Sequence, residues 1–388
     1  MKNRLLTLLP VLAVSAWLSG CATAPPPATV APQMFADALF QPGTDPISAT
    51  QVFALSPAMK QYVDKEIATA RRNKGDRQGL LDALYTKGQL QLEYDSSLTR
   101  TAAQAFDARS GNCLSLMIMT AAFAKYLELP VRYQNVSVDE SWTRTGDLFY
   151  VSGHVNLTMG RRSANFLDTT PDELVVDFLP AAQLKGLRMR PISEQTVVAM
   201  YMNNRAVENL FDNRVDQAYW WARAALLEDP TLMTAYNTLG VIYRRHGQPA
   251  QAERVLSHVL TQEPDNTQAL SNLVLLMKMQ GRGEEERMLG ARLLALQPHP
   301  PYQYFDLGMQ AMQRGDYQAA RDLFGKEVAR SAFVHEFHFW LAQADYALGD
   351  LPAARKQMAL AVEHSTSTQS RQQYSAKLEW LKARGAAR

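Results

Sequence analysis

Cys113 is the residue of this sequence best suited to nucleophilic chemistry. It follows Gly111 and Asn112, a pair typical of a turn, and precedes an apolar run of helical length. A thiol at a helix start is favoured in its thiolate form, because the helix dipole and the free N–H groups of the first turn attract negative charge. The alternative is a buried structural cysteine that packs as a small hydrophobic residue.

His154 is the histidine that could serve such a thiol. The chain has seven histidines, and the other six lie from His246 onward, in a part of the sequence with a different pattern. His154 stands in a strand-like segment that follows Cys113 in the chain. A nucleophile and a base of these types are what a thiol–imidazole pair requires. A lone histidine on a strand is otherwise usually a hydrogen-bonded or surface residue.

A third group would hold the imidazole and fix its tautomer, and two aspartates compete for that role. Asp168 could lie across from His154 if a tight hairpin turns at residues 160–162. Asp177 ends a stronger run of β-branched residues after a longer loop. Either could instead be an ordinary strand-end or turn aspartate.

Three segments around these residues carry a family resemblance. They are Gly-Asn-Cys-Leu-Ser-Leu at 111–116, Ala-Lys-Tyr-Leu-Glu-Leu-Pro-Val-Arg-Tyr at 124–133, and Val-Asp-Phe-Leu-Pro at 176–180. Together they resemble the transglutaminase-like superfamily, which has a papain-like fold. The resemblance covers about residues 75–182. It implies a helix that begins with the cysteine, a strand that begins with the histidine, and the aspartate on the next strand.

The resemblance also implies roles for the residues. Cys113 is the expected nucleophile, His154 the expected base, and Asp177 is favoured over Asp168 because it matches the terminal Val-Asp motif of the family. The chain departs from the family in two places: Val155-Asn156 follows the histidine where an aromatic residue or Ala-Trp is usual, and Glu128 stands where glycine is common.

The elements that must position these residues form an expected α+β domain over residues 35–190. Helical periodicity appears at 56–73, 77–90 and 113–127, and strand-like runs appear at 131–138, 148–159, 165–167 and 174–179. A helical half followed by a strand-rich half is typical of the α+β class.

The rest of the chain, residues 198–388, has helices only and an internal repeat. Gly247, Gly281, Gly315 and Gly349 are spaced by 34 residues, and Asn213 holds the same phase one repeat earlier. Glycine and asparagine are the residues that most readily adopt the left-handed conformation that ends a helix. Five residues after each position come Ala218, Ala252, Glu286, Ala320 and Ala354.

This period and the small residues resemble the tetratricopeptide repeat. In that repeat the glycine ends the first helix, and the alanine lets the second helix pack closely against it. We expect about five repeats over residues 198–366, followed by a polar capping helix at about 371–384. The resulting fold class is a papain-like α+β domain followed by an all-α solenoid. A solenoid of this kind would bind a protein or peptide partner.

The N-terminus resembles the signal of a bacterial lipoprotein. Lys2 and Arg4 precede an apolar run that is too short to span a bilayer, and Leu-Ser-Gly-Cys at 18–21 matches a lipobox. The resemblance implies removal of residues 1–20 and lipidation of Cys21, with residues 21–34 as a Pro-rich tether. Ala22, which is not an aspartate, favours the outer membrane, with the protein facing the periplasm.

Charge and cysteine content limit the partners, disulfides and cofactors that we expect. Removal of residues 1–20 leaves 38 basic and 38 acidic side chains of the original 40 and 38, so we expect no nucleic-acid partner. The chain has two cysteines, so lipidation of Cys21 leaves Cys113 as the sole thiol, with no internal partner for a disulfide. We expect no cofactor and no metal, since neither a phosphate loop nor a three-ligand spacing is present.

The sequence supports two main hypotheses. One is a membrane-anchored thiol enzyme of the cell envelope that hydrolyses or transfers amide bonds of proteins or peptides, with the repeats recruiting a partner or substrate. The other is a non-catalytic scaffold, or an envelope assembly factor, in which the transglutaminase-like domain is degenerate. The complete set of cysteine, histidine and aspartate favours the enzyme.

Overall fold

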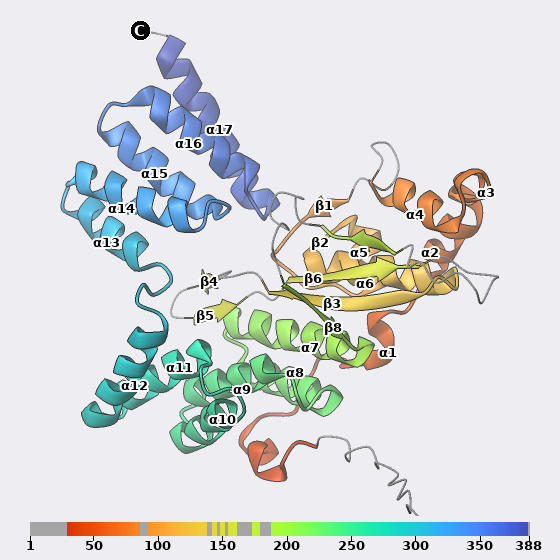
Figure 1. Ribbon diagram of the computed structural model, residues 1–388, viewed down its shortest axis with the longest axis horizontal. Helices are drawn as coiled ribbons and strands as arrows, with labels where there is room; N and C mark the ends of the chain where they lie inside the picture. Colours follow the sequence, from red (N-terminus) through yellow and green to blue (C-terminus); the bar gives the residue numbers. More distant parts are fainter. Residues whose placement is uncertain are drawn as a thin grey trace, which may run out of the picture.

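The computed structural model describes residues 29–85, 90, 92–137, 142–145, 148–151, 154–160, 173–178 and 188–386. Cys21 and Asp168 lie outside these ranges. A small α+β region is followed by a long array of helices that ends at the C-terminus (Figure 1). Within the described ranges, none of the helices combines the length and the apolar character that crossing a membrane needs.

The α+β region begins with short helices. In chain order they are the one-turn segments η1 (Pro32–Met34) and η2 (Asp37–Leu39), then α1 (Ala49–Val52), α2 (Pro57–Gln61), η3 (Tyr62–Glu66), α3 (Ala68–Lys74), α4 (Asp76–Tyr85), α5 (Ala102–Ala108) and α6 (Cys113–Tyr126). Helix α6 begins at the predicted nucleophile. Helix α4 is described to Tyr85, and residues 86–89 of the helix expected over 77–90 lie outside the described residues.

The strands are β1 (Glu93–Tyr94), β2 (Ser110–Gly111), β3 (Val131–Ser137), β4 (Trp142–Thr145), β5 (Leu148–Val151), β6 (His154–Met159), β7 (Leu174–Val176) and β8 (Arg188–Ile192). The main sheet is antiparallel in the order β7-β6-β3-β8, β4 and β5 form a hairpin, and β1 pairs with β2 in parallel. The strand expected over 148–159 is therefore two strands, and β8 was not expected. The strand expected at 165–167 lies outside the described residues.

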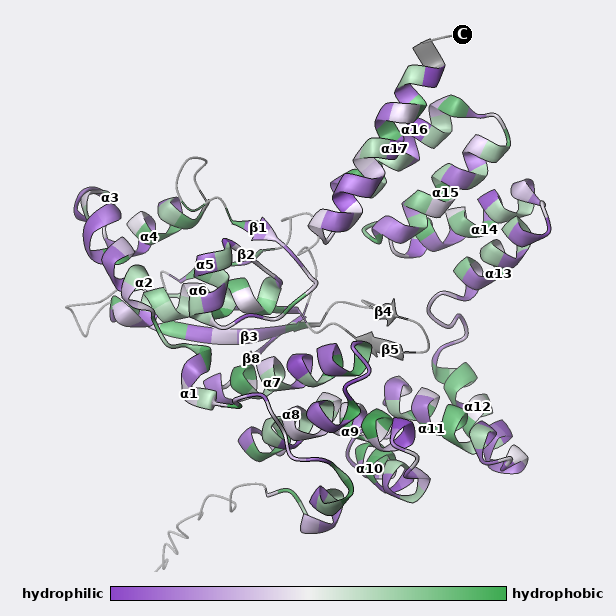
Figure 2. Ribbon diagram, turned by 180° about the vertical axis from the view of Figure 1, so that it is seen from behind, coloured by the Kyte–Doolittle hydropathy of each residue, from purple (hydrophilic) through white to green (hydrophobic). Residues whose placement is uncertain are grey.

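Helix α6 covers one face of the main sheet. Its apolar residues are almost all buried, and it is mostly green in the hydropathy view (Figure 2). Val155, Leu157 and Met159 alternate along β6 and belong to the same hydrophobic cluster as α6, each with no exposed surface. Because side chains alternate along a strand, His154, Asn156 and Thr158 form a second row of side chains along β6. His154 is the first residue of β6, at the end of the strand near Cys113.

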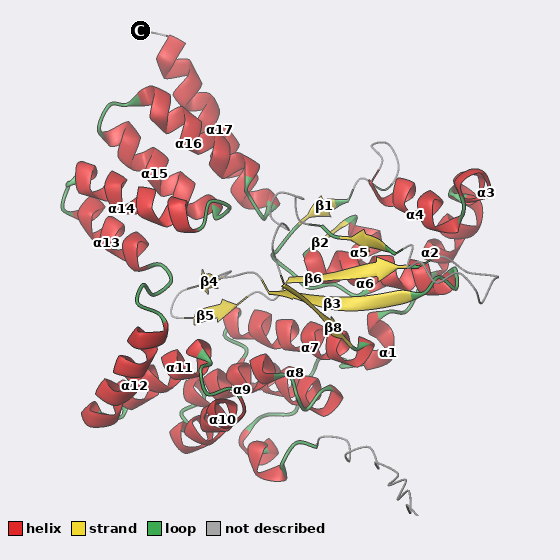
Figure 3. Ribbon diagram, viewed as in Figure 1, coloured by secondary structure: helices red, strands yellow, loops and turns green. Residues whose placement is uncertain are grey.

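The helical array consists of five helix pairs and a final helix. Figure 3 draws these helices in red. The pairs are α7 (Glu194–Phe211) with α8 (Val215–Glu228), α9 (Met233–Arg245) with α10 (Pro249–Gln262), α11 (Thr267–Met279) with α12 (Gly283–Leu296), α13 (Gln303–Gln313) with α14 (Tyr317–Arg330), and α15 (His335–Ala347) with α16 (Leu351–Glu363), before α17 (Thr368–Ala386). The array begins at Glu194, slightly before the expected residue 198.

Each helix pair turns through a residue with positive φ. Asn213 has a φ of 57°, and the φ angles of Gly247, Gly281, Gly315 and Gly349 lie between 71° and 81°. These are the positions that the 34-residue spacing predicts. A side chain with a Cβ is disfavoured there, and asparagine is the non-glycine residue that tolerates the conformation best.

The array is divided into two stacks between α12 and α13. The buried residues of the first stack belong to one hydrophobic cluster with the α+β region, whereas α13 to α17 form two clusters of their own. The division coincides with the irregular repeat: the four alanines at the small-residue position are fully buried, but Glu286 replaces them in α12. No residue of α12 is buried, and Met288 is 62% exposed.

The segment from about residue 30 to residue 45 packs along α8, α9 and α10. Phe40, which is 5% exposed, stacks on Tyr219 with ring centroids 3.9 Å apart, and the Tyr243 hydroxyl donates to the carbonyl of Met34 at 2.9 Å. Trp220 donates to the carbonyl of Gln41 at 2.6 Å. Met34, the last residue of the expected tether, and the residues after it are therefore folded onto the helical array. Aromatic side chains of the array stack on Phe40 and donate hydrogen bonds to the backbone of this segment.

Candidate active site

Cys113 is the first residue of α6, and the turn before it is closely built. Asn112 caps the helix: its Oδ1 accepts from the Ser115 N–H at 2.9 Å and from the Ser115 hydroxyl at 2.7 Å. A Cβ on Gly111 would lie 2.7 Å from the Cβ of Ser115, so glycine is required there by close approach. The thiol is half-buried and free of any disulfide. These contacts fix the point at which the helix begins, and hence the position of the sulfur.

His154 and Asp177 are brought together by the pairing of β6 with β7. In the β6–β7 register Leu157 pairs with Val176, and continuing that register by one residue places Asp177 opposite Asn156, two residues along the strand from His154. His154 Nε2 lies 2.8 Å from both Asp177 Oδ1 and Asp177 Oδ2. The two side chains are 5% and 4% exposed. Nε2 can therefore donate to a carboxylate that is almost removed from water.

Asn156 is a member of this group that the sequence analysis treated only as a departure from the family pattern. Its Nδ2 donates to Asp177 Oδ2 at 3.0 Å, and its side chain is fully buried. Its own Oδ1 has no hydrogen-bond partner. The signal was available in the sequence: residues two apart on a strand share a face, so Asn156 had to lie beside His154.

The electrostatics of His154 favour the imidazolium ion. Burial lowers the pKa of His154, but hydrogen bonds to Asp177 and Cys113 and the negative charge of both partners outweigh it, so that the pKa rises to about 9. The thiol is near enough to the ring to contribute to this rise, as the carboxylate is. Since Nε2 is bound to Asp177, Nδ1 is the nitrogen left for Cys113.

The structure thus brings three of the predicted residues together, Cys113, His154 and Asp177, in the order thiol, imidazole, carboxylate. Asp168, the rival third residue, cannot be placed. A thiol beside an imidazole that a buried carboxylate orients is an arrangement able to attack a carbonyl carbon and to move a proton to and from the reacting atoms. Over the described part of the chain, no three His, Cys, Asp or Glu side chains gather as a metal ion would require.

The two departures from the family pattern each have a structural counterpart. Val155 is fully buried under α6, so this position is part of the core of the domain. Glu128 has a φ of 54°, in the left-handed region that favours glycine. The backbone at Glu128 thus adopts the conformation that glycine favours, although the side chain is a glutamate.

The helical array is the part of the chain that comparisons with known proteins identify. A family model described as tetratricopeptide repeat matches residues 305–369. Residues 305–369 contain tetratricopeptide repeats. The match falls on α13 to α16, where the glycine and alanine positions follow the period, and arrays of this kind present surfaces for protein partners.

Solved structures similar to this chain include MamA, Pseudomonas aeruginosa pilF and yeast Tom70. MamA is 19% identical over 45% of this chain and 93% of its own, with a TM-score of 0.25. The pilF structure is 18% identical over 49% of this chain and 94% of its own, with a TM-score of 0.28. Tom70 is 13% identical over 48% of this chain and 40% of its own, with a TM-score of 0.34. TM-scores this low support no inference about overall architecture or function. A search of curated protein sequences finds no match to the chain.

Proposed function

We propose that this protein is a membrane-anchored thiol enzyme of the cell envelope that acts on amide bonds of a protein or peptide. The observation that carries the proposal is the position of His154, which is hydrogen-bonded to the buried Asp177 carboxylate and lies near enough to the Cys113 thiol for that group to raise its pKa. The tetratricopeptide repeats would hold the substrate or a partner protein. A lipid on Cys21 would anchor the chain, in the outer membrane facing the periplasm if Ala22 directs sorting there.

The chemistry follows from the geometry. The Cys113 thiolate attacks the amide carbonyl carbon and forms a C–S bond, while the carbonyl oxygen takes the negative charge. The N–H groups of Cys113 and Leu114, which have no acceptor within the helix, would bind that oxygen, since the N–H of Ser115 is already held by Asn112. The His154 imidazolium then gives its proton to the amide nitrogen, the C–N bond breaks, and an amine leaves behind a thioester.

The second half of the reaction returns the enzyme to its starting state. Water or an amine attacks the thioester carbonyl, neutral His154 takes the proton from the attacking atom, and the thiolate leaves. Asp177 stays ionised throughout and stabilises the imidazolium when it forms. Water as the attacking group gives hydrolysis, and an amine gives acyl transfer.

The test is labelling with an iodoacetamide-based thiol probe. The full chain should carry Cys21→Ser, so that Cys113 is its only thiol. At neutral pH and low probe concentration we expect this chain to be labelled. Adding Cys113→Ala to it should abolish labelling, and adding His154→Ala should make labelling much slower. Equal labelling with and without His154 would show that the thiol is an ordinary one and would refute the proposal.

A non-catalytic scaffold is the second candidate, and the family match over residues 305–369 favours it. Under that function the protein would bind its partner through the repeats, and substitution of Cys113 would change nothing. Capture of a partner with unchanged envelope function in a Cys113→Ala strain would support the scaffold. Loss of that function, with partner binding intact, would support the enzyme.

A further inference from the structure

The loop between β1 and α5, residues 95–101, lies between the Cys113 turn and the first helix of the repeats. Thr99, which is 2% exposed, stands at its centre. The Thr99 hydroxyl accepts a hydrogen bond from Asn112 Nδ2 at 2.8 Å, and its N–H donates to Glu208 Oε1 at 2.6 Å. Asn204 Nδ2 approaches the same hydroxyl at 3.3 Å. One buried threonine therefore connects α7 to the residue next to Cys113.

On the side of the thiol, the hydrogen bond that Asn112 donates to the Thr99 hydroxyl fixes the helix cap. The Asn112 amide uses its oxygen to hold Ser115 and its nitrogen to hold Thr99, so both ends of the group are bound. The Ser115 hydroxyl also accepts from the Arg100 N–H at 2.8 Å. The orientation of Asn112 thus depends on the Thr99 hydroxyl, and the starting point of α6 depends on Asn112.

On the side of the repeats, Glu208 is a charged anchor on α7. Its carboxylate is 16% exposed and forms an ion pair with Arg205 at 2.6 Å. Burial raises the pKa of Glu208 above its ordinary value, although hydrogen bonds from the side chain and backbone of Thr99 and the nearby charge of Arg205 oppose that effect. An acid held in this way on a long, well-packed helix is a rigid support for the loop.

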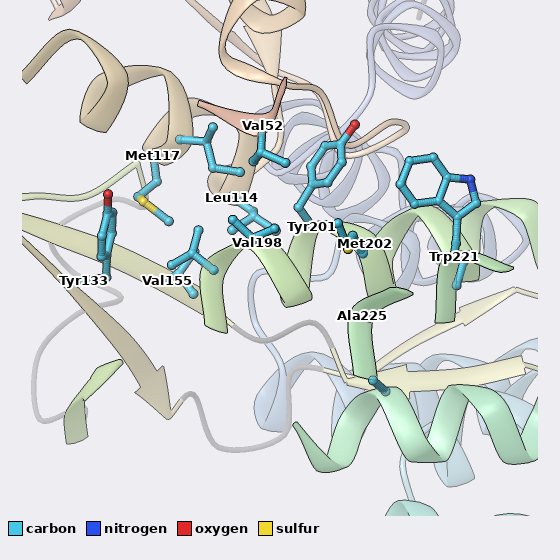
Figure 4. Packing of buried hydrophobic residues seen from close by; sticks show 14 of the residues in the cluster. Val52, Leu114, Met117, Tyr133, Val155, Val198, Tyr201, Met202, Trp221 and Ala225 are labelled. Carbon is cyan, nitrogen blue, oxygen red and sulfur yellow. The ribbon is translucent and has the colours of Figure 1, made fainter. Parts of the chain in front are cut away.

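Helix α7 shares the hydrophobic core of the α+β region. Leu114 and Met117 of α6 and Val155 of β6 lie in the same cluster as Val198 and Tyr201 of α7 (Figure 4). Helix α6 also contacts α7 directly. The first repeat helix therefore contributes both core and hydrogen bonds to the domain that holds the thiol.

We propose that helix α7 is a working part of the thiol site, and that Thr99 and Glu208 are positioning residues for Cys113. Glu208 holds the loop, Thr99 transmits that position to Asn112, and Asn112 fixes where α6 begins relative to His154. The proposal rests on the proposed function, because it concerns the same thiol. Under this proposal the repeats do more than recruit a partner, because their first helix, α7, is needed for the geometry of the reaction.

The test is the rate of alkylation of Cys113 by iodoacetamide as a function of pH, in the full chain with Cys21→Ser. Thr99→Val keeps the shape of the side chain and removes the hydroxyl, and we expect it to slow alkylation about tenfold at neutral pH, since small displacements of reacting groups have large effects on rate. Thr99→Ser, which keeps the hydroxyl, should restore the rate and the pH profile.

The matched control is Thr101→Val. Thr101 caps α5 by accepting from the Gln104 N–H at 3.3 Å, two residues farther along the same loop, so the variant loses a similar local hydrogen bond away from the thiol. Its alkylation rate should stay within about twofold of the parent chain. If Thr99→Val does not fold, Thr99→Ala and Thr101→Ala form the same comparison.

The possible results separate the two proposals. Alkylation that depends on His154 but is equal in the parent and Thr99→Val chains would overturn the role of α7 and leave the proposed function standing. Equal slowing by Thr99→Val and Thr101→Val would also overturn it, because general loosening would then explain the effect. A parent chain whose alkylation does not depend on His154 would overturn both proposals.

Discussion

His154 Nε2 lies 2.8 Å from both carboxylate oxygens of Asp177, and neither side chain is more than 5% exposed. A pair this far from water interacts strongly, because little solvent is present to screen it. The charge on the imidazole is therefore coupled to folding as well as to chemistry. The stability of the protein should report on it.

The first prediction concerns stability against pH. The pKa of His154 is raised to about 9 in the folded chain, above about 6.5 for an unfolded histidine. The protonated pair therefore contributes its full stability below pH ~6.5, and that contribution is lost as the pH rises through 9. Relative to His154→Gln, the free energy of unfolding of the parent chain should fall by up to about 1 kcal/mol per pH unit in this window. Denaturant unfolding at several pH values measures it; parallel curves for the two chains would contradict it.

The second prediction distinguishes the two aspartates. Asp177→Asn keeps the shape of the side chain but removes its charge, so the imidazolium loses its stabilising partner. We expect alkylation of Cys113 at neutral pH to slow at least about tenfold. Asp168→Asn should leave the rate unchanged. The opposite pattern would show that Asp168 is the third residue of the site.

The third prediction concerns Asn156. Asn156→Leu removes the hydrogen bond to Asp177 Oδ2 and also removes an Oδ1 that is buried without a partner. Because the lost hydrogen bond and the removed unpaired oxygen offset each other, stability should change by less than about 1 kcal/mol, while alkylation slows several-fold. Thr158→Val is the control, since Thr158 lies on the same strand face and its Oγ1 is also unpaired. An equal rate for Asn156→Leu and Thr158→Val would count against a role for Asn156.

The sequence contained enough information to predict the repeats and the chemical groups of the site. The 34-residue spacing placed the left-handed positions correctly, Asn213 included, because one local requirement recurs at each turn. Cys113 was placed at a helix start by its turn residues, and α6 begins there. These are local signals, which depend on a few neighbouring residues.

What the sequence did not reveal depends on contacts between distant segments. Strand β8 is short, contains Pro191 and joins the sheet by pairing with β3. The packing of residues 30–45 on α8 to α10 joins segments more than 170 residues apart. It includes the hydrogen bond that the Ala36 N–H donates to the Tyr219 hydroxyl. The link from Glu208 through Thr99 to Asn112 is of the same kind. No periodicity or motif encodes such pairings.

The fourth prediction tests the packing of the N-terminal segment. Phe40 is 5% exposed and stacks on Tyr219, so Phe40→Ala should lower the free energy of unfolding by about 3 kcal/mol. Neighbouring Leu39 is 38% exposed, and Leu39→Ala should cost less than about 0.5 kcal/mol. Denaturant unfolding of both variants provides the measurement. Similar small losses would mean that the segment is not held by Phe40.

The most direct test of a Cys113 nucleophile activated by His154 is the pH profile of Cys113 alkylation from pH 5 to 10, in the Cys21→Ser chain with and without His154→Ala. Since the imidazolium persists to about pH 9, we predict faster alkylation in the parent chain than in His154→Ala at neutral pH, and loss of that difference as the pH rises through about 9. Superimposable profiles for the two chains would contradict the account.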